Sequence, residues 1–128
     1  MYQKSTPVQN RTADLFADEG YDIEMLPEVD GGNSYGIKST SNPDYLIEGK
    51  AFDCYSPEPG TDFDSITRTL RKKSVTQAER LVLNLDGYPI EKVDGLMETL
   101  LRRTNGDLKH IDELFIVRDN VITRIFLR

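Results

Sequence analysis

An almost uninterrupted apolar run at residues 80–85, RLVLNL, constrains the fold of this chain more than any other feature. A short run of this kind is typical of a β-strand that is covered on both faces. Segments with helical periodicity precede and follow it, and helices that alternate with strands produce a sheet with helices on its faces. The run therefore predicts an α/β fold in which a mixed sheet is flanked by helices.

The other elements follow from the spacing of apolar residues and from turn residues. Apolar residues at every third or fourth position predict helices over 8–19, 62–79 and 89–103. Thr6 and Pro7 suit the start of the first helix, and Asp62 suits the start of the second. Alternating or β-branched runs predict strands over 21–26, 44–47, 51–55, 80–85, 113–117 and 121–126. The third helix is expected to bury Ile90, Val93, Leu96, Met97, Leu100 and Leu101.

Composition narrows the chemistry that the chain can perform. Its 128 residues fit a single domain over 1–128. One cysteine, Cys54, and one histidine, His110, exclude an internal disulfide, a cysteine-based zinc site and any mechanism that needs two histidines. A net charge of −6 is unusual for a passive nucleic-acid-binding module and suits a basic protein partner. An enzyme built from this chain must use carboxylates, lysines, hydroxyls or a hard cation.

Two aspartates lie at corresponding ends of a predicted β-hairpin. Asp44 opens the strand 44–47, a turn follows at Glu48-Gly49, and Asp53 lies near the end of the returning strand. Paired strands would bring the two carboxylates together, and a hard cation such as Mg²⁺ could then bind both and complete its shell with water and phosphate. The alternative is a turn residue and a solvent-facing strand residue, although Asp is disfavoured inside strands.

The helix predicted over 62–79 carries a candidate partner for these acids. Ile66, Leu70, Lys73 and Gln77 share one stripe, which is expected to pack on the sheet. Lysine rarely points inward without a partner, so Lys73 is expected to meet the aspartates and to contact a phosphate oxygen or the attacking water. The alternative is a lysine that snorkels at the core edge. A basic patch beside this stripe consists of Arg68, Arg71 and Lys72.

The segments 42–57, NPDYLIEGKAFDCYSP, and 77–85, QAERLVLNL, resemble the C-terminal nuclease domain of contact-dependent growth inhibition toxins, the CdiA-type tRNA nucleases. Segments 10–13 and 20–23 fit the same pattern, so the resemblance spans most of the chain. These toxins belong to the PD-(D/E)xK nuclease superfamily. The resemblance implies a ribonuclease that needs a divalent metal, with Mg²⁺ expected, and that cleaves tRNA.

The same resemblance implies how such a domain is used. It implies a toxin domain that is part of a longer polypeptide, is secreted or delivered from a cell surface, and acts in the cytoplasm of a target bacterium. It also implies a cognate immunity protein that blocks the active site. Membrane insertion by the domain itself is not expected.

The resemblance assigns roles to the acids and to a lysine. Asp44 matches the first motif acid and Asp53 the second, so both are expected to be catalytic and to bind the metal. Tyr55 occupies the position at which the superfamily usually has its lysine. The catalytic lysine is therefore expected on the following helix, as Lys73 or Lys72, and helical phase favours Lys73.

Further site residues and other hypotheses complete the expectations. Many superfamily members carry an acid on the first helix. Glu19, at the end of that helix, is the candidate here, and Gln9 and Asn10 at its start are the alternatives for the residue that completes the metal shell. Glu48-Gly49-Lys50 is a competing ExK register, ranked second because it coincides with the hairpin tip. The alternative functions are an inactive nucleic-acid- or partner-binding module on the same fold and an acidic partner-binding protein. Substrate contacts are expected from Arg68, Lys72 and Gln77.

Overall fold

A computed structural model describes residues 2–3 and 6–128, with side chains described from Thr6 onward. Three helices, α1 (Pro7–Asp18), α2 (Phe63–Thr76) and α3 (Ile90–Arg102), pack against a mixed sheet in this part of the chain. None of the helices in the described ranges is long and apolar enough to cross a membrane.

The main sheet has six strands in the order β2-β4-β5-β6-β7-β8. Its two central pairings, β5 with β6 and β6 with β7, are parallel, and the outer pairings are antiparallel. β6 lies in the middle, as its apolar sequence predicts. The bounds are β2 Ile23–Met25, β4 Tyr45–Ile47, β5 Lys50–Tyr55, β6 Arg80–Asn84, β7 Glu113–Arg118 and β8 Val121–Leu127.

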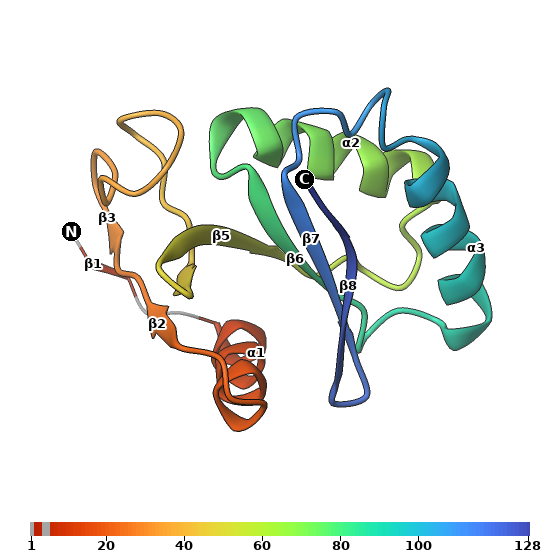
Figure 1. The fold of residues 1–128 in the computed structure, drawn as a ribbon, viewed down its shortest axis with the longest axis horizontal. Helices are drawn as coiled ribbons and strands as arrows, with labels where there is room; N and C mark the ends of the chain where they lie inside the picture. Colours follow the sequence, from red (N-terminus) through yellow and green to blue (C-terminus); the bar gives the residue numbers. More distant parts are fainter. Residues whose placement is uncertain (1, 4–5) are drawn as a thin grey trace.

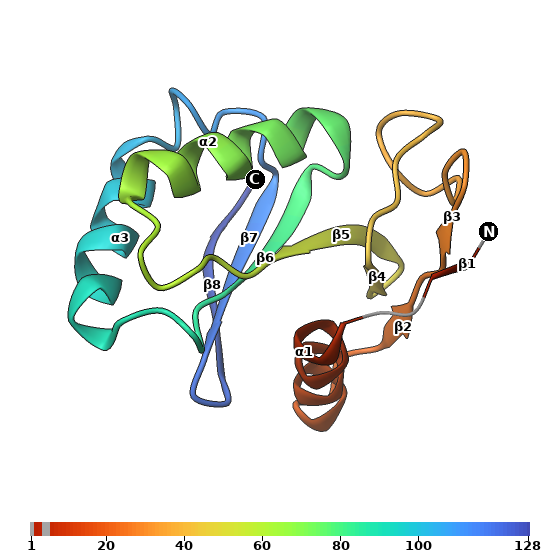
Figure 2. The same cartoon turned by 180° about the vertical axis from the view of Figure 1, so that it is seen from behind.

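Helices cover both faces of this sheet. Figures 1 and 2 show α2 and α3 side by side, with α1 beside β2 at the other end of the molecule. Leu81 and Leu83 of β6 belong to the core under α2 and α3, whereas Val82 belongs to a second core with Phe16 of α1 and Phe115 of β7. The two faces of β6 are thus both buried, which confirms the expectation drawn from residues 80–85.

Local signals account for most element boundaries. Thr6 caps α1 in a capping box with Gln9, and Asp62 caps α2 through the Ser65 amide. The turns Glu48-Gly49 and Asp119-Asn120 have positive φ at both residues, as tight hairpin turns require. All the predicted helices and strands are therefore present.

Several details differ from the sequence-based expectation. Helix α2 ends at Thr76 rather than near residue 79, because the Gln77 carbonyl accepts a hydrogen bond from the Ile37 amide instead of continuing the helix. Ile90 and Leu101 are more than half exposed, so the buried stripe of α3 is narrower than predicted. A separate two-stranded sheet, β1 (Tyr2–Gln3) with β3 (Glu28–Val29), was not predicted.

The polar segment between β3 and β4 is held in place by hydrogen bonds to the end of α2. We call residues 30–43, between β3 and β4, the strap. The Asn42 amide donates to Gln77 Oε1 at 3.0 Å, the Ile37 amide to the Gln77 carbonyl at 3.0 Å, and the Ser41 hydroxyl to the Thr76 carbonyl. Gly36 makes this contact possible, because a Cβ there would lie 2.8 Å from the Gln77 carbonyl oxygen. The strap, which leads into β4, is therefore hydrogen-bonded to the end of α2.

Candidate active site

The β4–β5 hairpin places Asp44 and Asp53 opposite one another. The ladder pairs Tyr45 with Phe52 and Leu46 with Ala51, and continuing this register sets Asp44 against Asp53. The Asp44 amide donates to the Phe52 carbonyl at 2.9 Å, which extends the ladder by one residue. Residues opposite one another in an antiparallel pair point to the same face. The two carboxylates therefore meet, as the hairpin predicted.

Asp53 faces α2 because it lies beside Leu81 in the parallel pairing with β6. It is only 3% exposed, and its Oδ2 accepts from the Lys73 Nζ at 2.7 Å. Burial is the largest influence and lowers the pKa of Lys73, but the charge of Asp53, its hydrogen bond and the other acidic neighbours together outweigh burial, and the net pKa is raised. Lys73 therefore remains a cation at neutral pH, with a quarter of its side chain exposed to solvent.

Asp44 is held by two donors that orient both of its oxygens. Gln9 Nε2 donates to Oδ1 at 2.9 Å, and the Cys54 amide donates to Oδ2 at 2.8 Å. Burial, followed by the charge of the neighbouring Asp53, raises the pKa of Asp44 to about 8. Asp44 is thus a carboxyl that becomes ionised readily only when a positive charge comes close to it.

These side chains surround one polar hollow of about 290 Å³. It lies between the hairpin, the beginning of α1, the strap and the end of α2. Its lining comprises Gln9, Glu28, Thr40, Asn42, Asp44, Asp53, Cys54, Lys73 and Gln77. A volume of this size accommodates a phosphodiester group together with water.

The donor set suits a hard cation that needs few protein ligands. Asp44 and Asp53 offer carboxylate oxygens, which Mg²⁺ prefers, and Mg²⁺ commonly keeps several waters. No group of three or more His, Cys, Asp or Glu residues able to hold a metal occurs in the described part of the chain. The two carboxylates of the hollow fit a hard cation such as Mg²⁺, which takes one or two carboxylates and water.

Other candidates from the sequence lie elsewhere. Glu19 is the exposed C-cap residue of α1, away from the hollow, and Lys72 is exposed on α2. Arg68 is also exposed, and its guanidinium donates to the Ser65 hydroxyl. Glu48 and Lys50 are exposed at the hairpin tip. Of the site residues predicted from the sequence, the structure gathers Asp44, Asp53, Lys73 and Gln77 around one hollow.

Tyr55 and Cys54 take no direct chemical part in this arrangement. Tyr55 packs against the core beneath α2 and α3. Cys54 lies in the opposite core with Phe16, and burial, followed by the nearby Asp44 charge, raises the pKa of its thiol to about 12. Cys54 contributes its backbone amide to Asp44, while its thiol stays protonated.

The sequence names Gln9 only as one of the first-helix residues that could complete the metal shell, and its hydrogen bond to Asp44 was not predicted. Its Oε1 accepts from the Thr6 amide at 2.9 Å, which completes the capping box and turns the Nε2 donor toward Asp44. The Tyr45 hydroxyl also donates to the Gln9 carbonyl at 2.8 Å. The Thr6-to-Gln9 spacing could have signalled the cap, but nothing local indicates the contact with Asp44.

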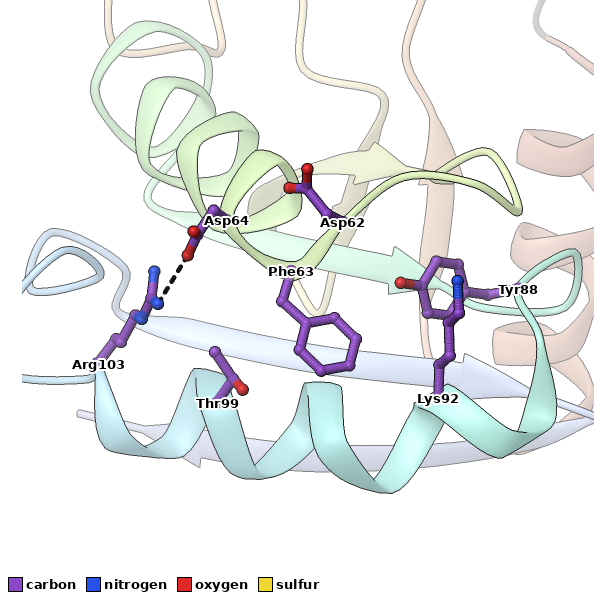
Figure 3. A pocket seen from close by; sticks show the side chains of 7 residues that line it. All are labelled: Asp62, Phe63, Asp64, Tyr88, Lys92, Thr99 and Arg103. Atoms are coloured by element: carbon purple, nitrogen blue, oxygen red, sulfur yellow. Dashed lines mark hydrogen bonds and ion pairs between the residues drawn. The ribbon is translucent and has the colours of Figure 1, made fainter.

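A larger hollow, of about 450 Å³, lies between the start of α2 and α3 (Figure 3). Its polar groups are already engaged with the protein. Asp64 pairs with Arg103 at 2.8 Å, Asp62 caps α2, and the Tyr88 hydroxyl donates to the Thr61 carbonyl. Size alone does not make this hollow the site of chemistry, because its two carboxylates already serve the helix cap and the ion pair with Arg103.

Comparison with solved structures identifies the class of fold to which the chain belongs. The chain resembles the toxin–immunity complex "CdiA-CT/CdiI" from Burkholderia pseudomallei, with a TM-score of 0.69 and 24% sequence identity over 95% of this chain and 92% of that one. At this identity the likeness establishes the fold, which is that of a CdiA-CT toxin structure.

The family then follows from the sequence. Residues 41–122 match the contact-dependent growth inhibition CdiA C-terminal domain, and the chain belongs to this family. A curated relative, tRNA nuclease CdiA-2 of Burkholderia pseudomallei (strain 1026b), is 38% identical over 77 residues, or 60% of this chain. The matched part of this chain corresponds to only 2% of the length of that relative.

Proposed function

We propose that this domain is a ribonuclease toxin that cleaves tRNA in a target bacterium with the help of a divalent metal, in the manner of PD-(D/E)xK nucleases. The observation that carries the proposal is the meeting of Asp44, Asp53 and Lys73 in one polar hollow. The curated relative named a tRNA nuclease supports the choice of substrate.

Asp44 and Asp53 would hold the metal, with Mg²⁺ the expected ion. When bound, it supplies charge neutralisation at the scissile phosphate and lowers the pKa of a water. The residues of the chain do the rest. Lys73 presents an ammonium beside Asp53, where it can donate to a phosphate oxygen or orient the attacking water. Gln9 and the Cys54 amide each donate to one oxygen of Asp44 and so fix the orientation of its carboxyl group.

Gln77 has a second role in addition to anchoring the strap. Its Oε1 accepts from the Asn42 amide, so the amide group is oriented and its Nε2 remains as a donor beside the hollow. No hydrogen bond from this Nε2 to another described residue is formed. We assign it to a phosphate or ribose oxygen of the substrate, with Arg68 and Lys72 attracting the RNA from the exposed side of α2.

The inactive-module alternative rested on Tyr55 in place of the usual lysine and on the missing first-helix acid. Lys73 reaches Asp53 from the helix, which answers the first point. Glu19, however, lies outside the hollow, and Gln9 occupies the first-helix position beside Asp44. The proposal also includes a cognate immunity protein that covers the hollow, since the solved neighbour is a toxin–immunity complex. Action in the cytoplasm of the target cell follows from the substrate proposed.

The deciding experiment is incubation of the domain with total tRNA and Mg²⁺, with and without EDTA, followed by sizing of the fragments. We expect cleavage with Mg²⁺ and none with chelator. Asp44→Ala and Asp53→Ala should each lower the rate at least 100-fold, whereas Asp94→Ala, at an exposed acid of α3, should cleave normally. Full activity of folded Asp44→Ala and Asp53→Ala proteins would refute the site.

Expression in bacteria distinguishes a nuclease from the remaining alternative, an acidic partner-binding protein. A nuclease should arrest growth, and the Asp53→Ala variant should not. An acidic partner-binding protein should be harmless in both forms.

A further inference from the structure

A second polar hollow adjoins the candidate active site. It measures about 260 Å³ and is lined by the strap, the beginnings of β5 and β6, and the residues that follow α2. Ala51 lines this hollow and Asp53 lines the active site. Both belong to one face of β5 and are two residues apart, so the hollows are separated by about 7 Å along the strand. After the end of α2, Ala78 lines this second hollow and the preceding Gln77 lines the active site, so the two hollows are adjacent there as well.

An exposed aromatic side chain stands in this hollow on a fixed backbone. Tyr35 is 49% exposed, although large aromatic side chains are usually buried. Its amide donates to Asn33 Oδ1, and Asn33 is itself buried and donates to the carbonyls of Pro27 and Pro43. Ser34, immediately before it, has φ 75°, a left-handed conformation unfavourable for a non-glycine residue. The backbone is therefore in an unfavourable conformation directly before the exposed ring.

Charged residues of both signs line the hollow together with Tyr35. Arg80 lines the hollow and is tethered by its ion pair with Glu113, with Nε 3.4 Å from Oε1. Glu79 lines the hollow as well and is exposed. A carboxylate would repel a bare phosphate. Donor and acceptor groups beside an aromatic ring instead match a nucleobase, whose edge carries both kinds of group and whose face stacks on aromatic side chains.

We propose that this hollow binds one unpaired nucleobase next to the scissile phosphate, stacked on Tyr35 with its edge toward Glu79 and Arg80. The inference rests on the proposed function, because it takes the phosphodiester of the same strand to lie in the hollow of Asp44 and Asp53. It assigns to the strap a part in choosing the cleavage position.

The first test measures binding of short single-stranded RNA without divalent metal, by fluorescence anisotropy. Tyr35→Ala should weaken binding roughly 5- to 100-fold, the range of base–aromatic stacking, and Tyr35→Phe should bind within about twofold of wild type. Ile90→Ala, which removes a large apolar side chain from α3 that is even more exposed (63%) than Tyr35, is the control and should bind as the wild type does. Wild-type affinity of Tyr35→Ala would overturn the proposal.

The second test uses the same RNA with an abasic nucleotide at each position in turn. One position should weaken binding to the wild type and have no further effect on Tyr35→Ala, since both changes remove the same contact. Additive losses at every position would overturn the nucleobase site. These outcomes are independent of catalysis: absence of tRNA cleavage by the wild type with Mg²⁺ refutes the nuclease, and a non-additive binding loss would still establish the base site.

Discussion

Lys73 is surrounded on α2 by other basic residues, yet it alone reaches the sheet. It follows Ile66 and Leu70 on the buried stripe, and its ammonium lies 2.7 Å from a carboxylate that is almost fully buried. Lys72, one position earlier, is rotated by about 100° on a helix and is exposed. A one-residue shift in helical phase therefore separates a site residue from a surface residue.

Lys73→Met and Lys72→Met form a matched pair for testing this difference. Lys73→Met should lower tRNA cleavage at least 100-fold and lower the free energy of unfolding by about 2–4 kcal/mol, because Asp53 would keep a buried charge without its partner. Lys72→Met should change the free energy of unfolding by less than about 0.5 kcal/mol. Urea denaturation and initial rates measure the two effects, and equal behaviour of the two variants would contradict the assignment.

Gln9 gives a second prediction at this scale. Gln9→Glu keeps an oxygen for the Thr6 amide, but places a third carboxylate against Asp44. More ligand charge strengthens binding of hard cations, so Mg²⁺ affinity measured by calorimetry should rise roughly tenfold. Without metal, the variant should be less stable than the wild type because the carboxylates repel.

The control for this comparison is Gln9→Ala. It removes the donor to Asp44 and the acceptor of the capping box, and should weaken α1 by about 1 kcal/mol without raising Mg²⁺ affinity. Unchanged affinity in Gln9→Glu would show that its side chain does not approach the cation site.

At the scale of elements, the sequence predicted more of the fold than of the site. Periodicity and caps give the helices, and the turns Glu48-Gly49 and Asp119-Asn120 set the hairpins. The pairing of Asp44 with Asp53 follows from the register of such a hairpin. The anchoring of the strap to α2 could not be predicted, because the contact of Asn42 with Gln77 is a hydrogen bond between distant segments that no local period reveals.

The strap can be tested through Gly36. Gly36→Ala places a Cβ against the Gln77 carbonyl and the Pro43 ring, so either the strap or the end of α2 must move. We expect a loss of about 1–3 kcal/mol in the free energy of unfolding, as for other overpacked positions. Gly60→Ala is the control, since no heavy atom lies within 4 Å of its added Cβ. Equal stability of the two variants would mean that the strap does not pack tightly on α2.

For the whole molecule, the raised pKa of Asp44 makes stability depend on pH and on metal together. Below about pH 4, Asp44 is protonated in both the native and the unfolded chain. As pH rises from 3.8 toward 8, the unfolded chain loses this proton while the native protein keeps it. The free energy of unfolding therefore falls by up to about 1.4 kcal/mol per pH unit because of this group. Above about pH 8 the loss is complete.

Melting temperatures measured without metal should therefore fall from pH 5 to pH 9, and less steeply in Asp44→Asn. Saturating Mg²⁺ should flatten the wild-type profile, because the cation favours ionised Asp44 and binds only the folded chain. Identical slopes for the wild type and Asp44→Asn would show that Asp44 is not the group responsible.

The candidate site draws on segments that are remote along the chain. Gln9 comes from the first helix, Asp44 and Asp53 from the hairpin, and Lys73 from the second helix. No contiguous fragment shorter than residues 9–77 contains all of the groups that meet in the hollow. Under the proposed function, an unfolded or truncated copy would lack the cleaving site, and the polypeptide would damage RNA only once the complete domain has folded.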